Sequence, residues 1–130
     1  MKKKDYKKWH DRKSLINDVA NRPDFHEREV WYCHLGENIG YEQDGKGRDY
    51  LRPILIVRKF NNEILWGIPL TSTIKGSRFY STISFGSGTK SSAILSQIRL
   101  IDAKRLSYRI GIISRQEIRV IIEQFKKLLP

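Results

Sequence analysis

The feature that most limits the possible folds is an unbroken apolar run at residues 53–57, with the sequence PILIV. A run of this length without alternating polar residues is typical of a short strand that is buried on both faces. The turn signal Asn61-Asn62 follows, and residues 63–70 have the length and composition of a return strand. We therefore expect a β-hairpin at the centre of the protein.

Four further segments have the β-branched and aromatic content of strands. They lie at residues 30–35, 79–85, 93–101 and 108–113, and a glycine-rich turn is expected at 86–90. Near the C-terminus, Ser114 and Glu117 have the S-x-x-E spacing of a helix capping box. Apolar residues then recur every three or four positions, as on one face of an amphipathic helix: Ile118, Ile121, Ile122, Phe125, Leu128 and Leu129. These elements predict a mainly β (α+β) fold, a small SH3-like, partly open barrel with a C-terminal helix.

An added segment precedes this body. Residues 5–19 carry Tyr6, Trp9, Leu15, Ile16 and Val19 near helical spacing, and the proline of Asn21-Arg22-Pro23-Asp24 ends the pattern. We expect an N-terminal helical extension over residues 1–27 and one domain over residues 28–130, because 130 residues have room for a single modest core.

The charge points to a polyanionic partner. Lys and Arg outnumber Asp and Glu by 25 to 14, which gives a net charge of +11. Residues 1–28 hold nine basic and five acidic side chains, a net of +4, so the rest of the chain holds +7. The predicted body is therefore itself basic. Nucleic acid is the partner that we favour, although an acidic protein or a membrane surface would fit the same charge.

Several classes of protein do not fit the sequence. The single Cys33 excludes an internal disulfide and is compatible with a reducing, cytoplasmic location. We find no signal peptide and no membrane-length apolar stretch. The three histidines (His10, His26 and His34) lack the spacing of zinc ligands, and there is no phosphate-binding glycine loop. We expect neither a metal nor a nucleotide cofactor.

Three motifs could carry chemistry. The loop GYEQDG at residues 40–45 leads to Arg52-Pro53 at the start of the apolar strand. The return strand ends in IPLTS at 68–72, which places hydroxyl groups where the chain leaves the sheet. The third motif, QIRLID at 97–102, puts polar groups within a predicted strand, although Asp102 is expected to cap a turn at Ala103.

Together with EVW at residues 29–31, these motifs resemble the PemK/MazF toxins of bacterial toxin–antitoxin pairs, in order and over about residue 28 to the end. The resemblance implies an SH3-like barrel, a homodimer and metal-independent cleavage of single-stranded RNA. The products would be a 2′,3′-cyclic phosphate and a 5′-hydroxyl. It also implies a cognate antitoxin whose acidic, disordered segment covers the RNA groove.

Carried over by motif, Arg52 and Thr71 would be the catalytic pair, with Glu42 in support. A guanidinium matches phosphate oxygens bidentately, but its pKa above about 12 makes it a poor proton donor. We expect Arg52 to clamp the scissile phosphate and Thr71 to donate to that phosphate or to orient the nucleophile. Glu42 is the one carboxylate among the motif positions that could accept the 2′-hydroxyl proton.

RNA contacts are expected around this pair. The candidates share a polar, cationic or aromatic side chain near the motifs: Tyr41, Gln43, Lys46, Arg48, Tyr50, Ser72, Lys75 and Gln97. Phe79 and Tyr80 are assigned to the core, as most aromatic residues in a small domain are. The chain departs from the family in a longer loop at 44–51. It also has Tyr41 and Ser96 where some members use a catalytic His and an acid.

Two alternatives remain open. A toxin with the same kind of barrel could instead inhibit a protein such as gyrase without catalysis, and such toxins lack the Arg-Pro and P-x-T-S motifs. The chain could also be a nucleic-acid-binding barrel that has lost its catalytic activity.

Overall fold

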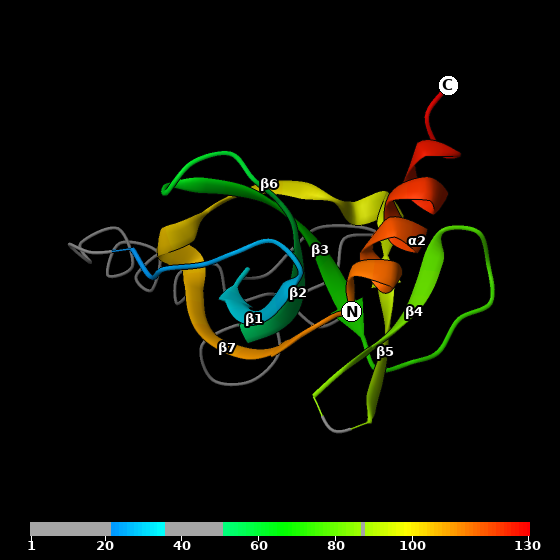
Figure 1. The fold of residues 1–130 in the computed structure, drawn as a ribbon, viewed down its shortest axis with the longest axis horizontal. Coiled ribbons are helices and arrows are strands. Elements are labelled where there is room, and N and C mark those ends of the chain that lie inside the picture. Colours follow the sequence, from blue (N-terminus) through cyan, green and yellow to red (C-terminus); the bar gives the residue numbers. More distant parts are fainter. Residues whose placement is uncertain (1–21, 36–50, 87) are drawn as a thin grey trace, which may run out of the picture.

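The computed structural model describes residues 22–35, 51–86 and 88–130, which form an antiparallel sheet and one C-terminal helix (Figure 1). The strands are β1 (Glu29–His34), β2 (Leu51–Lys59), β3 (Ile64–Thr71), β4 (Tyr80–Phe85), β5 (Thr89–Ile94), β6 (Arg99–Asp102) and β7 (Leu106–Ile112). Two short 3₁₀ turns, η1 (Leu95–Gln97) and η2 (Ala103–Arg105), flank β6, and the helix is α2 (Arg115–Lys126).

The seven strands of the described residues form one hydrogen-bonded sheet, in which β3 pairs with three other strands. The order is β4-β5-β3-β2-β1-β7, and β6 also pairs with β3. The first half of β3 pairs with β6, from Ile64 opposite Asp102 to Gly67 opposite Arg99. Its last residues pair with β5 instead, with Thr71 opposite Ser92. The fold is therefore mainly β, as predicted, and its strands pair antiparallel, whereas closure of the sheet into a barrel stays a prediction.

The apolar run of β2 does have both faces buried. Leu55 belongs to a first core, which also contains Ile118 and Ile121 of α2. Ile54 and Ile56 point to the opposite side, where they join a second core with Phe25, Trp31 and Leu65, among others. Alternate residues of a strand point to opposite faces, so a continuous apolar run is what two cores require.

The local signals for the hairpin and the helix are confirmed. The Asn61 side-chain oxygen accepts hydrogen bonds from the backbone N–H groups of Glu63 (2.8 Å) and Ile64 (3.0 Å). The capping box is complete, because Ser114 Oγ accepts from the Glu117 N–H (3.0 Å) and the Glu117 carboxylate accepts from the Ser114 N–H (3.2 Å).

The prediction of one continuous strand at residues 93–101 is wrong. The chain pairs with the end of β3 through β5, turns at η1, and then pairs with the beginning of β3 through β6. A hydrogen bond from the Ile98 N–H to the Leu95 carbonyl (3.4 Å) helps to close that turn. The turn predicted at residues 86–90 is shorter than expected, because β5 already begins at Thr89. The predicted helix at 5–19 lies outside the described residues.

Candidate active site

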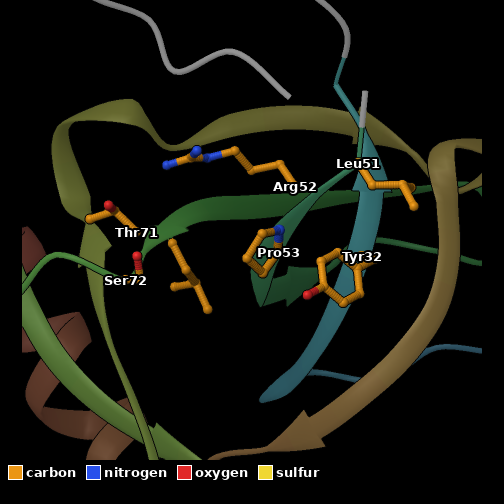
Figure 2. A pocket seen from close by; sticks show the side chains of 7 residues that line it. Tyr32, Leu51, Arg52, Pro53, Thr71 and Ser72 are labelled. Atoms are coloured by element: carbon orange, nitrogen blue, oxygen red, sulfur yellow. The ribbon is translucent and has the colours of Figure 1, made fainter. Parts of the chain in front are cut away.

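A pocket of about 410 Å³ lies where the ends of β2 and β3 separate (Figure 2). Its lining comes from three strands and the residue after β3: Tyr32, Leu51, Arg52, Pro53, Leu70, Thr71 and Ser72. Arg52, Thr71 and Ser72, which the sequence motifs single out, are therefore brought together on one pocket.

Strand register explains this meeting. Ile54 of β2 pairs with Pro69 of β3. Arg52 precedes Ile54 by two residues and Thr71 follows Pro69 by two, so in these antiparallel strands both lie on the same side of that pair. The ladder between β2 and β3 ends at that pair, whereas Arg52 keeps its partner Cys33 on β1 and Thr71 pairs with Ser92 of β5 on the other edge of β3. The two strands therefore diverge just where the motif residues stand, and the pocket occupies the space between them.

Arg52 is 2% exposed, which makes its guanidinium a nearly buried positive charge. Alternate strand residues share a side, so Arg52 lies on the same side of β2 as Ile54 and Ile56. Figure 2 shows its side chain extending along β3 in the direction of Thr71. A cation in such surroundings interacts with a phosphate more strongly than an exposed one, because water screens it less.

Thr71 and Ser72 provide hydroxyl groups at the other side of the pocket. Thr71 is half-buried, and its Oγ1 accepts a hydrogen bond of 3.4 Å from the Thr73 N–H. A hydroxyl that accepts a bond can still donate its own proton. Ser72 is exposed. Both side chains therefore have the chemistry to donate to an oxyanion in the pocket.

The chain after β3 folds back beside this end of the sheet. The Lys75 N–H donates to the buried Ser92 Oγ (3.1 Å), and Ser92 lies opposite Thr71. Farther along, the Arg78 guanidinium lies 5.0 Å from the centre of the Phe79 ring, which is 40% exposed. The assignment of Phe79 to the core is therefore wrong, and sequence reasoning missed this aromatic surface. The available signal was its place directly after a polar, basic loop.

Other predicted residues fall elsewhere. Gln97 lies half-buried in η1 and is not among the residues that line the pocket. Lys75 is exposed and also lies outside the lining. The remaining candidates lie outside the described residues: Tyr41, Glu42, Gln43, Lys46, Arg48 and Tyr50.

Asp102 has the structural role that the sequence predicted. Its carboxylate caps η2 by accepting from the Lys104 N–H (2.8 Å). It also accepts two hydrogen bonds from the Arg22 guanidinium, and these hold the pKa of Asp102 below its ordinary value.

The described residues show neither a reactive thiol nor a cluster of metal ligands. Burial raises the pKa of the Cys33 thiol to about 12, so the thiol stays protonated and unreactive near neutral pH. Within residues 22–35, 51–86 and 88–130, no three His, Cys, Asp or Glu side chains gather as a metal site would require. In the same part of the chain, no helix has the length and apolar character to cross a membrane.

Comparison with solved structures shows the fold of MazF proteins. The Mycobacterium tuberculosis toxin MazF-mt6 matches with a TM-score of 0.59 and 17% identity, over 77% of this chain and 94% of that one. MazF from Deinococcus radiodurans matches with a TM-score of 0.59 and 16% identity, over 83% and 96%. An endoribonuclease from a mycobacterial species, solved in complex with its cognate antitoxin, matches with a TM-score of 0.59 and 16% identity, over 82% of this chain and 98% of that one.

Comparison with curated protein sequences finds no match. The family comparison is decisive, because residues 26–129 match the model of the PemK-like, MazF-like toxins of type II toxin–antitoxin systems. That match covers most of the chain, including all the strands, the helix and the pocket. The chain therefore belongs to the PemK/MazF family of toxins.

Proposed function

We propose that the protein is a toxin that cleaves single-stranded RNA without a metal ion, by attack of a ribose 2′-hydroxyl on the adjacent phosphate. The products would be a 2′,3′-cyclic phosphate and a 5′-hydroxyl. The observation that carries the proposal is that Arg52 and Thr71 line one pocket in a chain of this family with a net charge of +11. Two of the solved structures that share the fold are named as endoribonucleases.

The proposed reaction needs donors that stabilise its transition state, and the pocket residues would supply them. Negative charge builds on the phosphoryl oxygens as the 2′-oxygen attacks, and preorganised donors stabilise it. Arg52 would bind two of these oxygens through its forked N–H groups, and Thr71 would donate from the opposite side. Because Arg52 is nearly buried, the phosphate would have to enter the pocket to reach it. Glu42 is our candidate for the base that accepts the 2′-hydroxyl proton.

The RNA strand would continue from the pocket over the surface after β3. Ser72, Lys75 and Arg78 would contact phosphates, and the exposed face of Phe79 would stack on a base. The candidates of the 41–50 segment and Gln97 keep their proposed RNA-binding roles. A cognate antitoxin with an acidic segment would compete for the same basic surface, and solved relatives include MazE–MazF complexes. We also propose a homodimer in the cytoplasm.

Cleavage of RNA in EDTA, with the cut ends mapped, tests the reaction. We expect Arg52→Met, which keeps an unbranched stem without the charge, to lower kcat by about 10²–10³. Arg58→Ala removes an exposed arginine at the other end of β2 and should leave kcat unchanged. Melting temperatures of both variants show whether they are folded.

Cleavage by Arg52→Met at the wild-type rate would refute the role of Arg52. RNA that stays intact across varied sequences, with growth arrest still seen in cells, would instead indicate a protein target such as gyrase. Intact RNA without growth arrest, but with RNA binding, would indicate a barrel that binds nucleic acid without catalysis.

A further inference from the structure

Three exposed apolar side chains form a row on the outer side of β2, β3 and β6, which we call the outer row: Phe60, Trp66 and Leu100. Trp66 lies opposite Leu100 of β6, and the Phe60 ring meets the Trp66 ring edge-on at a centroid distance of 5.0 Å. Their side chains are 44%, 41% and 57% exposed. Adjoining exposed apolar side chains can mark a surface that another segment or molecule covers.

The first described residues lead toward the outer row. Phe25 is completely buried in the second core, and it is contacted by Lys59, the last residue of β2. The Lys59 ammonium donates to the Phe25 carbonyl (2.9 Å) and lies 4.7 Å from the centre of its ring. The Lys59 N–H donates to the Glu27 carboxylate (2.9 Å). The chain is therefore fixed at this point, on the inner side of the sheet.

Three residues earlier, the Arg22 side chain reaches a residue on the outer side of β6. Arg22 Nε and Nη2 donate to the two carboxylate oxygens of Asp102, at 3.0 and 3.1 Å. Asp102 and Leu100 are two residues apart on β6 and share its outer side, where Leu100 faces solvent. Arg22, the first described residue, is therefore tied to the strand that carries Leu100 of the outer row.

That preceding chain has the right length and pattern to cover the row. Residues 5–19 carry Trp9, Ile16 and Val19 at spacings of seven and three, which one side of a helix would present. A helix of this length spans about 22 Å, whereas three neighbouring strands span about 10 Å. Two residues separate Val19 from the Arg22 anchor. The family match begins only at residue 26, so this segment is an addition of this chain.

We propose that residues 5–19 form an amphipathic helix that docks its apolar side on the outer row, with the Arg22–Asp102 pair setting where it begins. A segment tethered two residues from the anchor has a high effective concentration at the row, which favours it over a second molecule. The outer row lies at the far end of β2 from Arg52, so this docking is independent of the proposed reaction.

Hydrogen exchange of the full-length protein, followed by mass spectrometry on peptides from residues 5–19, tests this docking. We expect these amides to exchange about tenfold or more slowly than in a synthetic peptide of the same sequence. Trp66→Ser with Leu100→Ser should restore the peptide rate. Ile16→Ser should do the same without touching the body. The matched control is Val120→Ser, an exposed apolar residue of α2, which should leave the protection intact.

Exchange at the peptide rate in the wild-type protein would overturn the proposal. So would protection that survives the changes at Trp66 and Leu100, because the segment would then dock elsewhere. Sedimentation over a range of concentrations tests the remaining occupant. If covering of the outer row appears only in a dimer and is lost on dilution, the second copy occupies the row and the proposal is wrong.

Discussion

Arg52 and Thr71 occupy matching places on neighbouring antiparallel strands, each two residues beyond the Ile54–Pro69 pair, and both line the same pocket. This relationship depends on the end of the β2–β3 ladder at that pair, because the two strands are not paired beyond it and the pocket lies between their ends. The sheet thus opens a space between a buried cation and a hydroxyl group. In the proposed reaction both residues would act on one phosphate from the ends of strands rather than from a long loop.

The hydroxyl of Thr71 should matter for the rate of RNA cleavage. Thr71→Val keeps the shape of the side chain but removes its donor, so we expect kcat to fall by at least about tenfold. Thr71→Ser should keep most of the activity. Thr82→Val, at an exposed position of β4, serves as the control and should be neutral. Equal single-turnover rates for Thr71→Val and the wild type would contradict a donor role for Thr71.

Phe79 should affect the binding of RNA rather than the chemical step. Loss of one stacking aromatic costs about 1–3 kcal/mol of binding free energy, so Phe79→Ala should raise KM about tenfold with kcat unchanged. Phe60→Ala is a matched control, because Phe60 is similarly exposed and also has an arginine near its ring, but lies at the far end of β2. An unchanged KM for Phe79→Ala would exclude Phe79 from the RNA-binding surface.

Local sequence signals predicted the hairpin at Asn61, the capping box at Ser114 and the doubly buried strand, because each depends on a few neighbouring residues. The break at Leu95–Gln97 was not predictable in this way. It arises because β3 takes two different partners, and that choice is made by contacts far apart in the sequence. The Arg22–Asp102 pair, which joins residues 80 positions apart, is of the same kind.

The EVW motif has a structural explanation that the sequence did not provide. The buried Glu29 carboxylate accepts hydrogen bonds from the Trp31 indole (3.0 Å), the His26 N–H (2.8 Å) and the Arg109 guanidinium (3.0 Å). It therefore joins β1 to β7 and to the turn before β1. Glu29 of this motif therefore stabilises the sheet, whereas residues of the Arg-Pro and P-x-T-S motifs line the pocket.

Glu29 should make stability depend on pH. Burial favours its neutral form, but the hydrogen bonds from Trp31, His26 and Arg109 outweigh burial and lower the pKa of Glu29 below its ordinary value near 4.5. A lowered folded-state pKa contributes stability above about pH 4.5, and that contribution is lost as pH falls through the folded-state value. We expect Glu29→Gln to lower the free energy of unfolding by about 2 kcal/mol at pH 7.

Urea unfolding of the wild type and of Glu29→Gln at pH 7 and at pH 3 measures this effect. The difference in unfolding free energy between the two proteins should shrink at the lower pH, because below its ordinary pKa near 4.5 Glu29 takes up a proton in the unfolded chain. Glu123→Gln, in an exposed pair with Lys126, should differ little from the wild type at either pH. A difference for Glu29→Gln that is constant with pH would contradict the assigned shift.

Glu117 should contribute more to stability than the capping box alone requires. One oxygen of its carboxylate completes the box with Ser114, and the other accepts from the Ser84 N–H of β4 at 2.8 Å. Ser114→Ala should lower the free energy of unfolding by about 1 kcal/mol, as is typical for loss of an N-cap. Glu117→Ala should cost about 2 kcal/mol, because it also leaves the Ser84 N–H without its acceptor.

Hydrogen exchange separates the two contributions of Glu117. The Ser84 amide should exchange faster in Glu117→Ala but not in Ser114→Ala, since only the first change removes its acceptor. Gln116→Ala, at an exposed position in the same helical turn, should change neither stability nor exchange at Ser84. Equal losses of stability for Ser114→Ala and Glu117→Ala, with Ser84 equally protected in both, would show that Glu117 acts through the cap alone. The expected inequality would instead show that the same carboxylate both starts α2 and fixes it to the sheet, which places the helix over the first core.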